Sequence, residues 1–229
     1  GNGMPARCAP WKNIQEKRHV KSVTLVGETA DSILLKVVSA LEPGNSDYVN
    51  SYTIRSDGSI RVTAELFIRH DTMPEIPRFG MKMALPGDYT YMQWYGRGPH
   101  ESYWDRKSSA FIGYYSGEVM EQYTPYIFPQ ENGNKTDVRW VTLTNAEGMG
   151  FRIEGLQPLE VNLHQYLEEN MDERVTHTID VPFENLVEVC IDLHQMGVGG
   201  DDSWGALPHP QYHLPVKEYS YGYRLRPLR

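Results

Sequence analysis

Residues 52–66 have the sequence Tyr52-Thr-Ile-Arg-Ser-Asp-Gly-Ser-Ile-Arg-Val-Thr-Ala-Glu-Leu66. Apolar and polar side chains alternate on either side of Asp57-Gly58, and alternation of period two is typical of half-buried strands. An Asp-Gly pair between two such runs indicates a β-hairpin, because both residues tolerate a positive φ. The stretch therefore predicts two antiparallel strands joined by a short turn.

The same alternation recurs along the chain. It predicts further strands at residues 32–38, 81–85, 89–94, 138–143, 150–154, 186–194 and 219–225. Helical patterns are short, with two turns predicted at residues 166–174 and one at 105–110. Many strands joined by Gly- and Pro-rich turns predict two packed antiparallel sheets. The fold class is therefore all-β, and we expect a single sandwich domain over residues 1–229.

The composition of the chain argues against several classes of function. The chain of 229 residues carries a net charge of −8, which argues against binding to nucleic acid or to an acidic membrane surface. No apolar run approaches the ~20 residues that span a bilayer. Cys8 and Cys190 are far apart, so neither a disulfide framework nor a cysteine-built zinc site is expected. With 15 Tyr and 5 Trp, the acidic chain suits a neutral, hydroxylated ligand such as a sugar.

Two glycine-rich stretches interrupt the strand pattern and are predicted to be loops, where functional residues concentrate. They are residues 95–101 and residues 197–205. With their surroundings they belong to three longer motifs: Tyr95-Gly-Arg-Gly-Pro-His-Glu-Ser-Tyr103 with Asp105-Arg-Lys107, then Tyr126-Ile-Phe-Pro-Gln-Glu-Asn-Gly133, and Gly197-Val-Gly-Gly-Asp-Asp-Ser-Trp-Gly205.

In their order and spacing, these motifs resemble the C-terminal region of glycoside hydrolase family-two β-galactosidases, and the resemblance covers nearly the whole chain. It implies a large antiparallel two-sheet supersandwich, similar to galactose mutarotases, that lacks its first strands before Gly1. It also implies that the parent enzyme hydrolyses terminal β-D-galactosides such as lactose with retention. The two catalytic Glu residues of the family lie on a TIM-barrel domain outside this region, so no catalytic residue is assigned here.

The resemblance also implies the partners and cofactors of this region. Its partner would be the rest of the β-galactosidase chain, with a β-galactoside sugar as ligand, and the region would be inactive alone. No cofactor is expected here, since any Mg²⁺ or Na⁺ would belong to other parts of the full-length enzyme. Assembly into homo-oligomers, the natural substrate and the cellular compartment stay open.

Trp204 is the expected substrate-binding residue. A flat indole face can stack on the C–H face of a pyranose, and the resemblance places this Trp beside the leaving-group sugar. The alternative is an indole buried in the core. We expect the neighbouring residues to support the loop: Gly199, Gly200, Asp201, Asp202 and Ser203. Adjacent acids point apart and supply few oxygens, so neither a metal site nor a catalytic pair is expected there.

Other polar clusters have less defined roles. Arg97, His100 and Glu101, and likewise Glu131-Asn132, are expected to be structural or interfacial. His209 and His213 are four residues apart, but Pro210 and Pro215 disfavour the helix that would make them a metal pair.

Two other functions remain alternatives. One is a stand-alone aldose-mutarotase-like enzyme, with His100, His177 and Glu131 as acid and base. The other is a carbohydrate-binding module built around Trp204.

Overall fold

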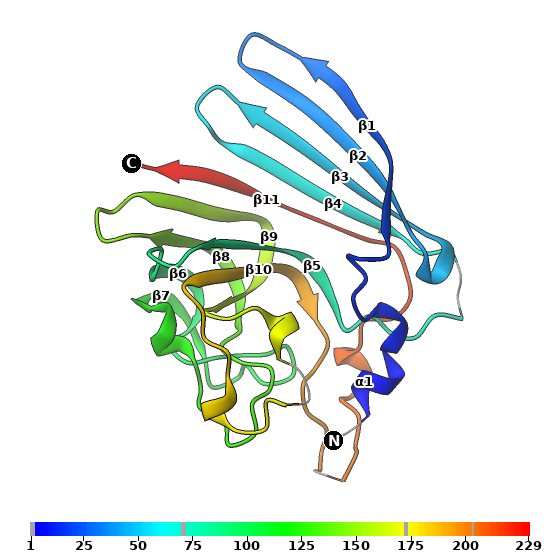
Figure 1. Cartoon of the computed structure of the whole chain (residues 1–229), viewed down its shortest axis with the longest axis vertical. Helices are drawn as coiled ribbons and strands as arrows, with labels where there is room; N and C mark the ends of the chain where they lie inside the picture. The colour runs from blue at the N-terminus through cyan, green and yellow to red at the C-terminus, as the bar shows by residue number, and fades with distance from the viewer. Residues whose placement is uncertain (1–2, 70–71, 172–173, 203) are drawn as a thin grey trace. The chain divides into compact units, whose positions relative to one another are not determined.

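The computed structural model describes residues 3–69, 72–171, 174–202 and 204–229 (Figure 1). Over these residues the chain is built from strands, with one short helix, α1 (Met4–Arg7). The strands are β1 (Arg18–Glu28), β2 (Ser32–Leu41), β3 (Ser46–Arg55), β4 (Ile60–Phe67), β5 (Arg78–Pro86), β6 (Tyr91–Gly98), β7 (Phe111–Glu118), β8 (Lys135–Thr144), β9 (Gly150–His164), β10 (Leu186–Gln195) and β11 (Tyr219–Leu228). The 3₁₀ turns are Ala9–Trp11, Pro43–Asn45, Val119–Gln122, Glu168–Asn170, Thr178–Asp180 and Pro210–Tyr212. The prediction of an all-β chain is confirmed.

The chain divides into two compact units. The first contains Gly1–Phe79 and Gln195–Arg226, and the second contains Gly80–His194 and Pro227–Arg229. That residues 1–229 form one domain stays a prediction. None of the helical segments in the described part of the chain is long and apolar enough to cross a membrane.

The first unit is an antiparallel sheet in the order β1-β2-β3-β4-β11. β3 and β4 form the predicted hairpin, with Ile54 opposite Ile60 and Gly58 at φ 82° in the turn. Phe79 packs against the rings of Tyr219 and Tyr221, with centroids 5.5 and 5.4 Å away. These contacts pack the start of β5 against the C-terminal strand β11.

The second unit is an antiparallel sheet in the order β10-β9-β8-β6-β7, with β5 pairing to β10. Its core consists of fully buried side chains from the central strands: Met92, Trp94, Val138, Val141, Leu143, Ile153, Leu159, Val187, Val189 and Ile191. In this unit the predicted strands are present with longer bounds, except that the strand predicted at 89–94 is shifted to 91–98.

Several local predictions were wrong. Residues 95–98, predicted as loop, form the end of β6. A Cβ on Gly96 would lie 2.9 Å from the Cα of Val138, and one on Gly98 would lie 2.7 Å from the ring of Tyr115. These glycines allow close packing inside a sheet, not a turn. The predicted helix at 166–174 is only the 3₁₀ turn Glu168–Asn170 over the described residues, and β1 and β7 were not predicted.

Candidate functional site

The glycine-rich loop at residues 197–205 belongs to the first unit. The amide of Gly197 donates to the carbonyl oxygen of Tyr212 at 2.8 Å, which closes the loop at its start. Trp204 is 95% exposed, so the alternative of a core indole is wrong. Both faces of the indole are open to a flat apolar ligand. Ser203 lies outside the described residues, so its expected supporting role stays a prediction.

Asp202 holds the backbone on both sides of the exposed indole. Its Oδ1 accepts hydrogen bonds from the amide of Trp204 at 2.8 Å and from the amide of Ala206 at 3.3 Å. This is the side-chain-to-backbone bonding by which Asp stabilises tight turns. Asp201 instead pairs with Nε2 of His209 at 2.9 Å, where both side chains are exposed.

The glycines of this loop differ in whether a larger residue could replace them. Gly205 has φ 115°, a conformation that disfavours any side chain. A Cβ on Gly200 would lie 2.3 Å from the carbonyl oxygen of Ala206, whereas one on Gly199 would meet nothing within 4 Å. The loop thus needs glycine at 200 and 205 for geometric reasons, and position 199 is sterically open.

In the second unit, Glu101 connects residues 95–107 with residues 126–133. Its carboxylate is 8% exposed and accepts hydrogen bonds from the amide of Gly133 at 2.9 Å and from the hydroxyl of Tyr126. It also forms an ion pair with Arg106, whose guanidinium donates to the Tyr126 hydroxyl as well. These contacts make Glu101 a structural link between the two stretches. Burial, followed by the charges of Glu131 and Glu101, raises the pKa of the nearby Tyr103 phenol.

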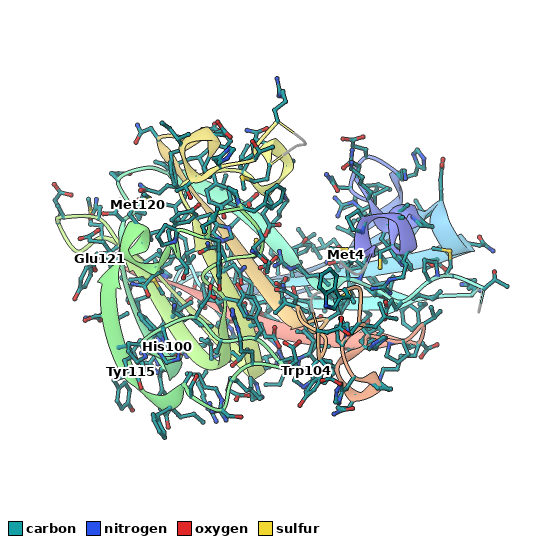
Figure 2. The ribbon with its side chains drawn as sticks, turned by 90° about the horizontal axis from the view of Figure 1, so that it is seen from below. Met4, His100, Trp104, Tyr115, Met120 and Glu121 are labelled. Carbon is teal, nitrogen blue, oxygen red and sulfur yellow. The ribbon has the colours of Figure 1, made fainter. Side chains whose placement is uncertain are left out.

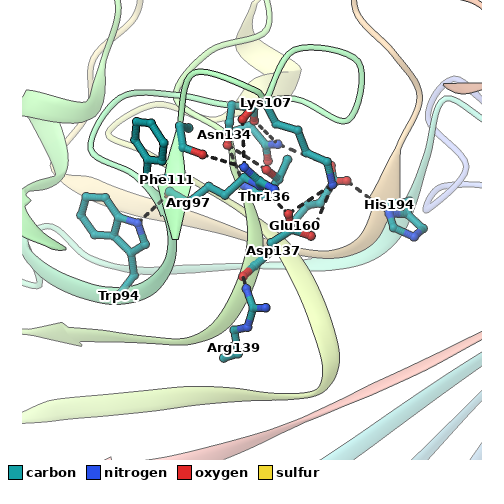
Figure 3. Close-up of polar contacts among 12 residues, drawn as sticks. Trp94, Arg97, Lys107, Phe111, Asn134, Thr136, Asp137, Arg139, Glu160 and His194 are labelled. Carbon is teal, nitrogen blue, oxygen red and sulfur yellow. Dashed lines mark hydrogen bonds and ion pairs between the residues drawn. The ribbon is translucent and has the colours of Figure 1, made fainter. Parts of the chain in front are cut away.

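A second ion-pair network surrounds Asp137 (Figure 3). Arg97 Nε lies 2.5 Å and Lys107 Nζ 3.2 Å from Asp137 Oδ2, and Arg97 also donates to the carbonyl oxygen of Ala110 at 2.7 Å. Burial opposes the charge of Asp137, but the hydrogen bonds from Arg97 and Lys107 outweigh it and lower the pKa of this carboxyl. Arg97 therefore fixes the segment that follows β6.

Lys135 is a buried lysine at the start of β8. Its side chain is 2% exposed, and the described residues offer no hydrogen-bond partner to Nζ. Burial lowers the pKa of this ammonium to about 8, although the Glu101 charge acts in the opposite direction. Nζ lies 5.3 Å from the ring centroid of Trp94, a cation–π distance that offsets part of the desolvation.

The sequence did not single out Trp104, which stacks on His194 with ring centroids 4.7 Å apart (Trp104 is labelled in Figure 2). Nδ1 of His194 lies 3.2 Å from Oε1 of the buried Glu160. The three residues come from distant segments, so no local motif could have indicated their contact.

A mutarotase-like enzyme would use His100, His177 and Glu131 as acid and base. Each of these residues contacts a different side chain. His100 lies 3.2 Å from the hydroxyl of Ser109, His177 lies 3.6 Å from Asp180, and Glu131 accepts from Asn162 at 2.5 Å. These contacts suit structural roles.

His209 and His213 also have separate partners and flank a 3₁₀ turn. His209 pairs with Asp201, and His213 contacts Glu75 and the carbonyl oxygen of Pro208. A different trio has the composition of a metal site: within the described ranges, ligand atoms of His164, Glu168 and Glu188 lie within 4.8 Å of one another. No local sequence pattern groups these three residues.

Comparison with known proteins identifies related sequences over the whole chain. The family model described as β-galactosidase small chain matches residues 2–225. A β-galactosidase from Priestia megaterium is 42% identical over 229 residues, which are 100% of this chain and 22% of that protein. A β-galactosidase from Lactobacillus delbrueckii subsp. bulgaricus is 33% identical over 95% of this chain and 21% of its own length. The chain thus spans about a fifth of these relatives.

The matches among solved structures are more distant. An aldose epimerase homologue from C. elegans matches with a TM-score of 0.47 and 10% identity, over 90% of this chain and 68% of that one. A galactose mutarotase related enzyme from Lactobacillus acidophilus matches with a TM-score of 0.39 and 12% identity, over 90% and 71% of the two chains.

Proposed function

Since the chain belongs to the β-galactosidase small-chain family, we propose that it is the sugar-contacting, non-catalytic C-terminal region of a retaining β-galactosidase. The parent enzyme would hydrolyse terminal β-D-galactosides such as lactose. The chain corresponds to 22% of the Priestia protein, which leaves most of a longer enzyme to supply the catalytic groups.

The exposure of Trp204 carries this proposal. An indole that is 95% exposed loses favourable burial free energy unless a ligand or another part of the enzyme covers it. Its backbone amide is held by Asp202, so little backbone conformational entropy is lost when a ligand stacks on the ring. The C–H face of a pyranose is a fitting ligand because it is flat and apolar. We assign Trp204 to the sugar that departs in the reaction, such as the glucose of lactose.

The chemistry would be completed by the rest of the parent chain. In a retaining glycosidase one carboxylate attacks the anomeric carbon, and a second carboxyl group protonates the departing oxygen and later activates water. Glu168 and Glu188 are close enough in this chain to suggest such a pair. However, Glu188 is 2% exposed and bound to Lys82, so it is unsuited to attack a sugar.

Steady-state kinetics of the full-length enzyme test the role of Trp204. In Trp204→Ala we expect KM for lactose to rise about tenfold, since the loss of one stacking contact costs ~1.4 kcal/mol. The KM for a chromogenic β-galactoside with a non-sugar leaving group should change less than twofold. Ile179→Ala is the matched control, because Ile179 is 92% exposed and lies outside the loop. Equal losses on both substrates would contradict the stacking role.

The purified 229-residue chain provides an independent test. We expect no hydrolysis of the chromogenic substrate at high protein concentration. Turnover that survives repurification would mean that a catalytic carboxylate pair lies within this chain, and the proposed division of labour would be wrong.

A further inference from the structure

The end of β9 brings a buried imidazole together with two carboxylates in the second unit. His164 and Glu188 are directly opposite each other in the antiparallel pair of β9 and β10. Glu168 begins the 3₁₀ turn four residues after His164. One ligand atom from each residue lies within 4.8 Å of those of the other two. The sheet register, together with the turn after β9, therefore positions three side chains around one point.

His164 has one ring nitrogen available. The side chain is 4% exposed, and Nε2 lies 2.9 Å from the carbonyl oxygen of Asn132. A carbonyl oxygen only accepts, so Nε2 carries the proton and Nδ1 keeps its lone pair. Nδ1 is buried and has no hydrogen-bond partner among the described residues. A buried acceptor without a partner is destabilising, and a bound cation would remove that penalty.

Glu188 is held by donors on both of its oxygens. Oε1 lies 3.0 Å from Nζ of Lys82, and Oε2 accepts from the backbone amide of Glu168 at 3.0 Å. Each carboxylate oxygen has a second lone pair, so these contacts leave room for a metal bond. The hydrogen bond from Nε2 of His164 to the carbonyl oxygen of Asn132 and the contacts to Glu188 are outer contacts of the kind that orient metal ligands in proteins.

Lys82 contacts two carboxylates beside this point. Its Nζ lies 3.0 Å from a carboxylate oxygen of Glu169 and 3.0 Å from Oε1 of Glu188.

We propose that Nδ1 of His164 and the carboxylates of Glu168 and Glu188 bind one divalent transition-metal ion, with Zn²⁺ the best match. Imidazole is a preferred ligand of Zn²⁺, whereas Mg²⁺ favours sites made of oxygen atoms alone. Three protein ligands leave a fourth position for water in tetrahedral zinc geometry. Because Glu168 lies in the connection between β9 and β10, the ion would fasten that connection to the sheet. The role is structural and does not depend on the proposed glycosidase function.

Zinc titration of the 229-residue chain tests this site. After treatment with EDTA, we expect calorimetry to show one Zn²⁺ per chain, and we expect Zn²⁺ to raise Tm. His164→Gln and Glu168→Gln should each weaken binding at least tenfold and abolish the rise in Tm. His177→Gln is the matched control, since His177 forms an exposed pair with Asp180, and it should bind as tightly as the wild type.

Several results would overturn the proposal. These are the absence of stoichiometric binding by the wild type, unchanged binding by both His164→Gln and Glu168→Gln, and loss of binding in His177→Gln. If His164→Gln does not fold, Glu168→Gln still decides, because Glu168 is only partly buried. Mg²⁺ binding that Glu168→Gln weakens and His164→Gln leaves unchanged would also refute the assignment of the imidazole as a ligand. A visible Co²⁺ spectrum that changes in His164→Gln would support it.

Discussion

Buried Lys135 should make the stability of this chain rise with pH between 8 and 10. Burial lowers the pKa of Lys135 from 10.5 to about 8 in the folded chain. In the unfolded chain the side chain returns to its ordinary value. Between these two values the unfolded state binds one more proton than the folded state, so the free energy of unfolding rises with pH. Below pH 8 both states carry the charge, and the folded state bears the full cost of burying it.

The size of the effect follows from the two pKa values. Each unit of difference corresponds to about 1.4 kcal/mol, so the full cost is roughly 3 kcal/mol, of which about 2–3 kcal/mol is regained by pH 10. Above pH 10 the sign reverses. Burial raises the pKa of Tyr219 to about 12 and also raises that of Tyr103, Tyr166 and Tyr223, so the folded state retains protons that the unfolded state loses.

Lys135→Met tests this reasoning, because it keeps an unbranched chain of similar length and removes the charge. Urea unfolding would be followed by circular dichroism at pH 7, 8, 9 and 10. The free energy of unfolding of the wild type should rise by about 2–3 kcal/mol relative to Lys135→Met between pH 8 and pH 10. Lys107→Met is the control, since Lys107 is partly exposed and paired with Asp137, and it should keep the wild-type slope. Parallel curves for the wild type and Lys135→Met would refute the reasoning.

Two further substitutions, each with a matched control, should lower the free energy of unfolding. Gly80→Ala should lower the free energy of unfolding by about 3 kcal/mol, because its Cβ would lie 1.7 Å from Oδ1 of the buried Asp192. Gly27→Ala, where a Cβ meets nothing within 4 Å, should change it by under about 0.5 kcal/mol, and equal effects in urea unfolding would contradict the packing argument. Glu101→Gln should cost about 1–2 kcal/mol, because it removes the charge from a buried acceptor that binds the Tyr126 hydroxyl and the Gly133 amide, whereas the Arg106 guanidinium is exposed. His100→Gln on the exposed neighbour should be near neutral, and a thermal melt in which the two variants coincide would oppose the role of Glu101.

The strand pattern could be predicted where one face of a strand is buried. In β4, intermediate and buried positions alternate from Thr63 to Phe67, and the Asp57-Gly58 turn fixes the register. β1 was missed because every residue in it is exposed and the register shifts between Val20 and Ser22 and between Leu25 and Gly27. A bulge moves later side chains to the opposite face, so the alternation that marks a strand is lost.

Glycine explains the error in β6. In a sequence, glycine indicates a turn, but it also permits close packing of neighbouring strands. A Cβ at Gly96 would lie 2.9 Å from the Cα of Val138 on the neighbouring strand β8, which shows the second use. The distinction depends on neighbours that are distant in sequence.

For the candidate site, the sequence and the structure contribute different information. The loop containing Trp204 was indicated by its glycines and by an aromatic residue with no place in a strand pattern. The grouping of His164, Glu168 and Glu188 depends on the pairing of β9 with β10, and single-sequence patterns do not encode which strands become neighbours. The local chemistry could thus be predicted, whereas contacts across strands could not.

The link through Glu101 has a consequence for how the second unit opens. Tyr126 and Gly133 are 25 and 32 positions from Glu101 in the chain, yet both donate to its carboxylate. Detaching either segment leaves a buried charge with fewer donors, which makes separate fraying of the two segments costly. The amide protons of both segments should therefore exchange with solvent in a single cooperative event. Two stretches that are separate in the sequence would then form one foldon, a unit that opens cooperatively. A substitution that destabilises either stretch would therefore destabilise both.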